Sequence, residues 1–271
     1  MADKLTPEQV RAFWTAQAIQ HGQSPSASWS DVHVLDLEAR EIQQRLEDGD
    51  RVLDVGCGNG YSTVRFAAAR RIAIRGIDYI PQMIDEARVR ASALDQRLTG
   101  TVEFAVGDVS DLKEPASGYD KVIAIRVLIN LGSWPAQQAA LRGCGRLVKP
   151  GGLLLLSEAT LQGWNRLNAF RTEWGLPPIP MPAFNTYLDE EQVVATVAPA
   201  FEIVELVNFA STYYVGTRVL KPLLAAAAHP ALDVADPQLH WNRFWAQLPA
   251  AGDYGTQKLF VFRKRADAPV T

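Results

Sequence analysis

Apolar positions along the chain follow two spacings that alternate with each other. Short apolar runs of strand length precede segments in which apolar residues return every three or four positions, the period of a helix. The segment Arg51–Val55 is predicted to be a buried strand, after which helical spacing begins near Tyr61. Further strands are predicted at 72–78, 101–108, 119–127, 153–158, 201–207 and 258–263. Strands that alternate with helices indicate an α/β fold with a largely parallel sheet.

Two helices are predicted ahead of the first strand. Thr6 has the character of an N-cap, with Pro7 at the first helical position and Gln9 at the third, a common helix start. Apolar residues at helical spacing follow as far as Ala18, and a second helix is predicted from Asp31 to Leu46. The segment between them contains glycine and several serines and is predicted to be a loop.

The loop after the first strand carries Gly56, Gly58 and Gly60, and Asp54 stands two residues before the first of them. Glycine lets a backbone turn sharply and approach a ligand closely because it has no Cβ. The loop leads into a helix N-terminus, whose free N–H groups suit an anionic group. These features predict a nucleotide-like ligand at the carboxyl edge of the sheet.

This loop, Asp54-Val-Gly56-x-Gly58-x-Gly60, resembles motif I of the class I S-adenosylmethionine-dependent methyltransferases. A dinucleotide fingerprint would space its glycines differently, as Gly-x-Gly-x-x-Gly. A second match is the segment 147–152, Leu-Val-Lys-Pro-Gly-Gly, which leads into a buried strand and recurs in the same family. The resemblance covers residues 50–158 in detail and the last two strands loosely.

The resemblance implies a Rossmann-like sheet of seven mostly parallel strands, with the last strand antiparallel and helices on both faces. It implies one methyltransferase domain over 1–271, in which 49–159 bind the cofactor and 1–48 form an N-terminal helical cap. The segments 160–187 (the first insertion) and 211–255 (the second insertion) are too long for ordinary loops. We expect them to cover the substrate side as lids or to form a homodimer interface.

Cofactor contacts follow from the resemblance, position by position. Asp78 ends the second strand, where a carboxylate can accept both hydroxyls of a ribose. Tyr79 and Met83 would lie near ribose and adenine, although Met83 equally suits the core. Asp108 and Val109 would bind the adenine through a carboxylate and a backbone N–H, unless Asp108 only caps the following turn.

After the fourth strand, the guanidinium of Arg126 suits the carboxylate of the methionine part of the cofactor. The family often has His where Asn130 stands, so no base is assigned there. The cofactor expected is S-adenosyl-L-methionine, with S-adenosyl-L-homocysteine as product. The residues expected to bind it are Asp54, Gly56, Gly58, Gly60, Asp78, Tyr79, Met83, Asp108, Val109 and Arg126.

Methyl transfer from a sulfonium is an in-line displacement, in which the enzyme aligns the reactants and excludes water. It requires no metal, and it requires a base only where the acceptor must lose a proton. The candidate bases are His33, Glu158, Tyr213, Tyr214 and His240. We favour His33 and Tyr213, although each side chain also has an ordinary structural explanation.

Several acceptor classes are disfavoured by missing motifs. The Asn/Asp-Pro-Pro-aromatic motif of amino-methylating DNA enzymes does not follow the fourth strand, and neither Cys57 nor Cys144 follows a proline, as C5-cytosine enzymes require. Metal-dependent catechol-type enzymes have an Asp where this chain has Arg126. A small-molecule acceptor is therefore expected, with a hydroxyl oxygen favoured and nitrogen, sulfur and carbon left open.

The composition of the chain limits the classes of partner that it is expected to bind. The chain has 271 residues, 48% of them hydrophobic, and a formal charge of −3, which argues against a general nucleic-acid binder. No signal core or membrane-length apolar run is present, so a cytoplasmic enzyme without membrane association is expected. A nicotinamide-dependent oxidoreductase would need the other glycine spacing. The alternative is a methyltransferase-like binding protein without turnover.

Overall fold

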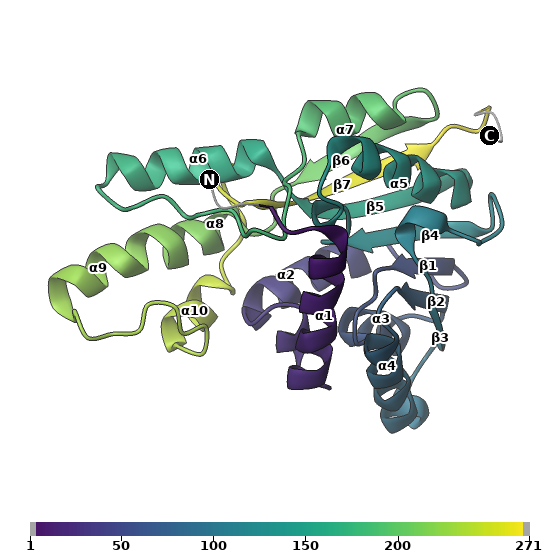
Figure 1. Cartoon of the computed structure of the whole chain (residues 1–271), viewed down its shortest axis with the longest axis horizontal. Coiled ribbons are helices and arrows are strands. Elements are labelled where there is room, and N and C mark those ends of the chain that lie inside the picture. Colours follow the sequence, from purple (N-terminus) through teal and green to yellow (C-terminus); the bar gives the residue numbers. More distant parts are fainter. Residues whose placement is uncertain (1–3, 268–271) are drawn as a thin grey trace.

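The computed structural model describes residues 4–267, except for the side chain at position 95. Its centre is a seven-stranded sheet in the order β3-β2-β1-β4-β5-β7-β6 (Figure 1). Strand β7 is antiparallel to both neighbours, and the other pairs are parallel. The predicted sheet and its antiparallel last strand are confirmed. The strands are β1 (Arg51–Val55), β2 (Ala73–Asp78), β3 (Thr101–Val106), β4 (Tyr119–Ile125), β5 (Val148–Ala159), β6 (Phe201–Val207) and β7 (Gln257–Lys264).

Helices cover both faces of the sheet. Helices α2 and α3 share one apolar cluster with the sheet, whereas α5 and α7 share another on the opposite face. Successive strand residues point to opposite faces, so each strand contributes to both clusters. The helices are α1 (Pro7–His21), α2 (Val32–Gln43), α3 (Tyr61–Ala69), α4 (Pro81–Leu94), α5 (Trp134–Leu147), α6 (Leu161–Glu173), α7 (Glu190–Val197), α8 (Ser211–Tyr214), α9 (Lys221–Ala228) and α10 (His240–Trp245).

The strand order places a ligand crevice in a predictable position. From β1 the chain adds β2 and β3 on one side, and it then returns to place β4 on the other side of β1. In open α/β sheets, ligands bind outside the carboxyl ends of the strands at such a reversal. The glycine loop (Gly56–Gly60) follows β1 at this point.

Two strands end earlier than the sequence predicts. Strand β4 ends at Ile125, because Arg126 has a φ of +55° and cannot continue an extended chain. Strand β3 ends at Val106, because Asp108 begins a capped 3₁₀ turn. In both places a tight turn replaces the last predicted strand residues at the carboxyl edge of the sheet.

Both predicted N-terminal helices form, but α2 ends at Gln43, so Leu46 lies beyond the helix that was predicted to include it. Thr6 and Gln9 make a reciprocal capping box at the start of α1. Helix α2 buries Leu35, Ala39 and Ile42. No helix within residues 4–267 has the length and apolar character needed to cross a bilayer.

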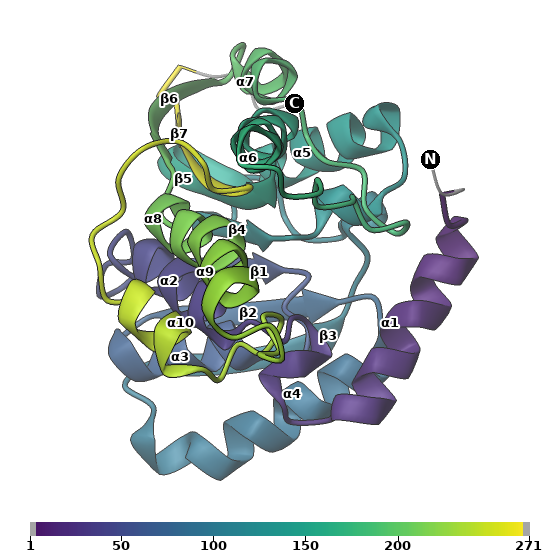
Figure 2. The same ribbon diagram turned by 90° about the vertical axis from the view of Figure 1, so that its left-hand side faces the viewer.

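The two insertions gather beyond the carboxyl ends of the strands. Helix α6 follows β5 directly, and α8 follows β6; a π-helical turn (Val215–Leu220) then joins α8 to α9. Figure 1 shows α6, α8, α9 and α10 together at the left, and Figure 2 shows them from their own side, with α1 standing apart at the right. The two insertions therefore lie at the edge of the sheet where a ligand is expected.

Candidate active site

The glycine loop has open space at its middle glycine. Gly58 has a φ of +54°, and a Cβ built on it would meet no atom within 4 Å. At Gly56 a Cβ would instead lie 2.3 Å from a methyl carbon of Val127, and at Gly60 it would lie 2.8 Å from the ring of Phe104. Only the middle glycine therefore presents its backbone to a space that a ligand can fill.

Asp78 lies where the sequence predicts it, beside this loop. It is 8% exposed, and its Oδ2 accepts a hydrogen bond of 3.0 Å from the N–H of Gly58. Its Oδ1 accepts a second bond, of 2.9 Å, from the N–H of Ile80. Burial raises the pKa of Asp78 to about 6. The carboxylate thus braces the loop and keeps further lone pairs for a ligand hydroxyl.

Asp54 carries an oxygen without a partner. Its Oδ2 accepts a hydrogen bond of 2.6 Å from the hydroxyl of Thr63, but Oδ1 is buried and bonds to no described residue. Burial is the largest cause that raises the pKa of Asp54 to about 7, and the charge of Asp78 adds to it. An orphaned carboxylate oxygen fits a cationic ligand group, such as the amino group of an amino acid.

The predicted adenine contacts have structural roles of their own. Oδ1 of Asp108 accepts hydrogen bonds from the N–H and the hydroxyl of Ser110, at 2.8 and 2.6 Å, so Asp108 does cap the following turn. Val109 lies in that turn, partly buried against the core. Met83 is 3% exposed, which favours its core interpretation. The guanidinium of Arg11 lies 5.6 Å above the ring of Tyr79, so α1 covers this side of the site.

Arg126 has a partner that sequence reasoning missed. Its guanidinium forms an ion pair with Glu38 of α2 and stacks 5.3 Å from the ring of Trp29. The structure thus gives Arg126 a protein carboxylate, whereas the sequence suggested a cofactor carboxylate. One signal pointed to Glu38, since this acid lies three residues after Leu35 on the apolar face of its helix.

Glu158 holds the turn that follows β4. It is fully buried, and its carboxylate accepts backbone hydrogen bonds from Val127 and Leu128, both at 2.8 Å, and from Ile129 at 3.4 Å. Burial raises the pKa of Glu158 to about 8. Because its carboxylate already accepts three N–H groups, the contacts favour a structural role over that of a base.

Tyr213 is buried and hydrogen-bonded to Asp31 and Asn242. It is 1% exposed, its hydroxyl donates a 2.7 Å hydrogen bond to Asp31, and the same oxygen accepts a 2.8 Å bond from Asn242. Burial raises the pKa of Tyr213 well above its ordinary value. Tyr214 is also buried and donates to Gln257 at 3.2 Å. Tyr213 thus joins the second insertion to the residue before α2, whereas Tyr214 joins it to β7. The enclosure of Tyr213 argues against its predicted role as a base.

Two of the candidate bases are the histidines His33 and His240. His33 is half-buried and lines a hollow of about 300 Å³ between α2, α3 and α10, together with Arg40, Arg65 and Arg243. No residue of the glycine loop lines this hollow. His240 begins α10. The structure therefore brings Asp54, Gly58 and Asp78 together, and among the described residues none of His33, Tyr213 and His240 hydrogen-bonds to them.

The N-terminal segment is fastened to the glycine loop. Asn59 is 3% exposed, and its amide donates hydrogen bonds of 2.8 Å to the carbonyl oxygens of Gly22 and Ser24. Nearer the start of α1, the ring of Phe13 stacks on Phe184 of the first insertion with 4.6 Å between the ring centroids. The cap thus contacts both the glycine loop and the first insertion.

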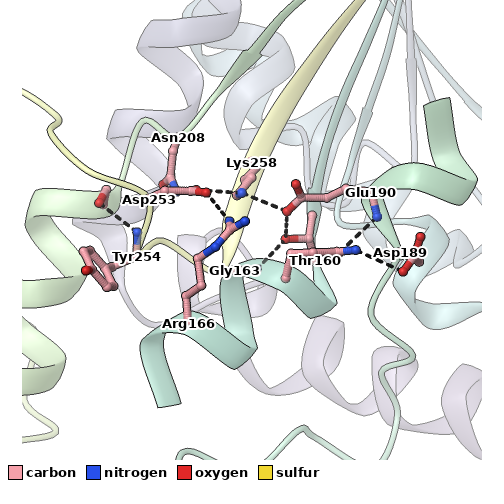
Figure 3. A network of polar contacts seen from close by, with 11 residues as sticks. Thr160, Gly163, Arg166, Asp189, Glu190, Asn208, Asp253, Tyr254 and Lys258 are labelled. Carbon is pink, nitrogen blue, oxygen red and sulfur yellow. Dashed lines mark hydrogen bonds and ion pairs between the residues drawn. The ribbon is translucent and has the colours of Figure 1, made fainter. Parts of the chain in front are cut away.

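A buried lysine ties both insertions to the sheet (Figure 3). The ammonium of Lys258 lies 2.8 Å from Oε1 of Glu190 and 2.6 Å from Oδ1 of Asp253, and the residue is 1% exposed. Glu190 also accepts a 2.7 Å hydrogen bond from Thr160, where the first insertion begins. Asp253, near the end of the second insertion, pairs in addition with Arg166 of α6.

Comparison with known proteins finds similarity to methyltransferases. Residues 52–152 match the family described as a methyltransferase domain. The 27-O-demethylrifamycin SV methyltransferase of Amycolatopsis mediterranei (strain S699) is 33% identical over 43% of this chain and 41% of that protein. The ubiquinone biosynthesis O-methyltransferase of Xanthomonas axonopodis pv. citri (strain 306) is 36% identical over 43% of this chain and 46% of that protein. The chain matches about half the length of these curated relatives.

Solved structures match nearly the whole chain. One match is magnesium protoporphyrin IX methyltransferase (ChlM) from Synechocystis PCC 6803, solved with bound SAH. The match covers 95% of this chain and 99% of that chain, with a TM-score of 0.59 and 15% sequence identity. The [4+2]-cyclase SpnF covers 98% of each chain, with a TM-score of 0.62 and 22% identity. At these identities the likeness concerns the fold alone.

Proposed function

Because this chain belongs to the class I S-adenosylmethionine-dependent methyltransferases, we propose that it transfers a methyl group from S-adenosylmethionine to a small-molecule acceptor. The observation that carries this proposal is the open space at Gly58, flanked by the carboxylates of Asp78 and Asp54. The donor supplies an electrophilic methyl group on a sulfonium, which is a good leaving group. The chain has to bind it, align the acceptor and exclude water.

The residues at the carboxyl edge fit this cofactor. The open backbone at Gly58 suits a closely approaching ligand, and Asp78 suits the ribose hydroxyls, as in dinucleotide folds. The unpartnered oxygen of Asp54 suits the amino group of the methionine part. Asp108 and Val109 lie at the end of β3, where we propose adenine contacts.

We propose that the cap and the insertions cover the acceptor. The contacts of Asn59 with the cap, and of Phe13 with Phe184, support closure over the site. On this proposal 1–48, 160–187 and 211–255 exclude water while 49–159 hold the cofactor.

A hydroxyl oxygen is the proposed acceptor atom. Relatives named as O-methyltransferases support it, although each match covers only part of the relative. The second candidate is binding without methyl transfer. A structural neighbour named as a [4+2]-cyclase favours keeping it, because one fold can host different reactions.

Two measurements test the proposal. Calorimetry with S-adenosylhomocysteine should give binding to the wild-type protein, and Asp78→Ala should weaken it by about tenfold or more, since the loop brace and the ribose acceptor are both removed. Methyl-labelled S-adenosylmethionine is then incubated with a fractionated cell extract. We expect label in the small-molecule fraction. Label in protein or nucleic acid would overturn the acceptor class, and binding without any label would favour the second candidate.

A further inference from the structure

Glu38 places a carboxylate inside the protein on the buried side of α2. Its side chain is 2% exposed. Oε2 pairs with the guanidinium of Arg126, and Oε1 accepts a hydrogen bond from the hydroxyl of Ser157. Arg126 follows β4, and Ser157 lies in the neighbouring β5. A buried carboxylate is costly unless it is paired, so one side chain of the cap holds the ends of two adjacent strands.

The backbone at Arg126 is strained and held by several contacts. Its φ of +55° lies in the left-handed region, which a residue with a Cβ adopts only at a cost. Its N–H donates a 2.8 Å hydrogen bond to the carbonyl of Ser157, and its carbonyl accepts a 2.7 Å bond from the amide of Asn130. The ion pair with Glu38 fixes the side chain of the same residue.

This strained residue is connected to the glycine loop through its neighbour. The side chain of Val127 packs so closely on Gly56 that a Cβ there would lie 2.3 Å from it. Val127 also donates its N–H to Glu158 at 2.8 Å. A movement of Arg126 would therefore move Val127 against the loop, because packed interiors do not deform freely.

We propose that Glu38 is a positioning residue of the cofactor site, which orients Arg126 and thereby keeps Val127 seated against the glycine loop. The cap helix α2 then shapes the floor of the site, in addition to covering it. The ring of Trp29, 5.3 Å from the guanidinium, stacks on the same side chain. This inference rests on the proposed function, because it takes the glycine loop to bind S-adenosylmethionine.

The test measures S-adenosylhomocysteine affinity by calorimetry and folding by thermal denaturation. Glu38→Gln keeps the shape of the side chain and removes its charge, whereas Glu38→Asp keeps the charge and shortens the reach. Arg126→Gln and the double variant complete a cycle. Glu41→Gln is the matched control, because Glu41 lies on the same helix and its carboxylate pairs with Arg45 instead.

We expect Glu38→Gln and Arg126→Gln each to weaken binding by about tenfold, and the double variant to bind no worse than Arg126→Gln. Glu38→Asp should lose less affinity than Glu38→Gln, since charge rather than shape orients the guanidinium, and Glu41→Gln should bind like wild type. If Glu38→Gln does not fold, Glu38→Asp against Glu41→Gln decides the question by affinity.

Two results separate the inference from the proposed function. If the wild-type protein does not bind S-adenosylhomocysteine, the proposed function fails and the inference fails with it. If the wild type binds, the inference alone is wrong when folded Glu38→Gln binds equally well. It is also wrong when the losses of Glu38→Gln and Arg126→Gln multiply in the double variant, because Glu38 would then act independently of Arg126.

Discussion

The hydroxyl of Thr63 donates a 2.6 Å hydrogen bond to Oδ2 of Asp54, and Oδ1 of the same carboxylate has no partner among the described residues. One residue thus combines a fixed orientation with an unused acceptor. Burial raises the pKa of Asp54 to about 7, so the state of this acceptor changes near neutral pH. In its ionised form, Asp54 can bind a cationic group at the carboxyl end of β1.

The first prediction concerns pH. The folded protein keeps the proton of Asp54 up to about pH 7, whereas the unfolded chain loses it near the ordinary pKa of 3.8. The protonated Asp54 therefore contributes to the free energy of unfolding at low pH, and this contribution is lost as the pH rises through about 7. Asp54→Asn cannot ionise, so its free energy of unfolding relative to wild type should increase from about pH 5 to about pH 8. Urea denaturation of both proteins at the two pH values measures this.

The affinity for the cofactor should change with pH in the opposite direction to the stability contribution of Asp54. Wild-type affinity for S-adenosylmethionine should rise over the same pH interval as Asp54 ionises, and the rise should be smaller in Asp54→Asn. Asp78, with a pKa of about 6, also titrates in this interval, so the difference between the proteins is the informative quantity. Equal pH dependence of affinity in the two proteins would exclude a contact between Asp54 and the cationic group.

The second prediction uses two glycines in similar surroundings. Gly58 and Gly151 both have positive φ, +54° and +77°, and a Cβ at either would meet no atom within 4 Å. Gly58→Val should weaken S-adenosylhomocysteine binding by at least about tenfold, because the side chain enters the ligand space. Gly151→Val, at the start of β5, should cost about the same 1–2 kcal/mol of stability from the left-handed backbone but leave binding unchanged.

Calorimetry and thermal denaturation of the two valine variants separate these effects. Normal affinity in a folded Gly58→Val protein would show that the ligand does not occupy the space beside Gly58. A comparable loss of affinity in Gly151→Val would mean that backbone strain alone, transmitted through the sheet, explains the result.

The parts of this protein that local chemistry determines were predictable from the sequence. The segment Arg51–Val55 forms β1 as predicted, because its three branched apolar residues suit a buried parallel strand. The positions of the glycine loop and Asp78 followed from motif spacing that reflects backbone geometry. The capping box at Thr6 was equally local, since its hydrogen bonds join residues three positions apart.

Contacts between distant segments were not predictable in this way. Glu38 and Arg126 are 88 positions apart, and the hydroxyl of Tyr213 bonds to a residue 182 positions away. Chemistry suggests that a tyrosine can serve as a base, but only the packing of α2 against the second insertion shows that Tyr213 is enclosed. The partners of a charged or phenolic side chain depend on tertiary structure, which a single sequence specifies only indirectly.

The third prediction tests that conclusion for Tyr213. Tyr213→Phe removes the hydroxyl that donates to Asp31 and accepts from Asn242. We expect the free energy of unfolding to fall by about 1–3 kcal/mol, because both buried partners lose a hydrogen bond. Methyl transfer at a temperature well below unfolding should stay within about threefold of wild type. A loss of activity by several hundredfold in a folded variant would restore Tyr213 as a base, since general base catalysis is worth about that much.

The last prediction concerns Lys258, whose ammonium is enclosed between Glu190 and Asp253 (Figure 3). Lys258→Met preserves much of the side-chain volume but leaves Glu190 without its cation, whereas Asp253 keeps its ion pair with Arg166. Removal of one partner from a buried ion pair costs about 3–5 kcal/mol. Lys149→Met is the control, because Lys149 is 41% exposed and pairs with Asp120 at the surface, where such pairs contribute about 0–1 kcal/mol.

Urea denaturation of the two methionine variants gives the comparison, and limited proteolysis locates the effect. Lys258 pairs with Asp253 of the second insertion and reaches the first insertion through Glu190, which bonds to Thr160. We therefore expect Lys258→Met to be cleaved first within 160–187 or 211–255, before the core is lost. Equal stability of Lys258→Met and Lys149→Met would show that this buried network contributes no more than a surface pair. Cleavage that begins in 49–159 instead would show that Lys258 supports the sheet itself, since the insertions would then remain attached while the core opens.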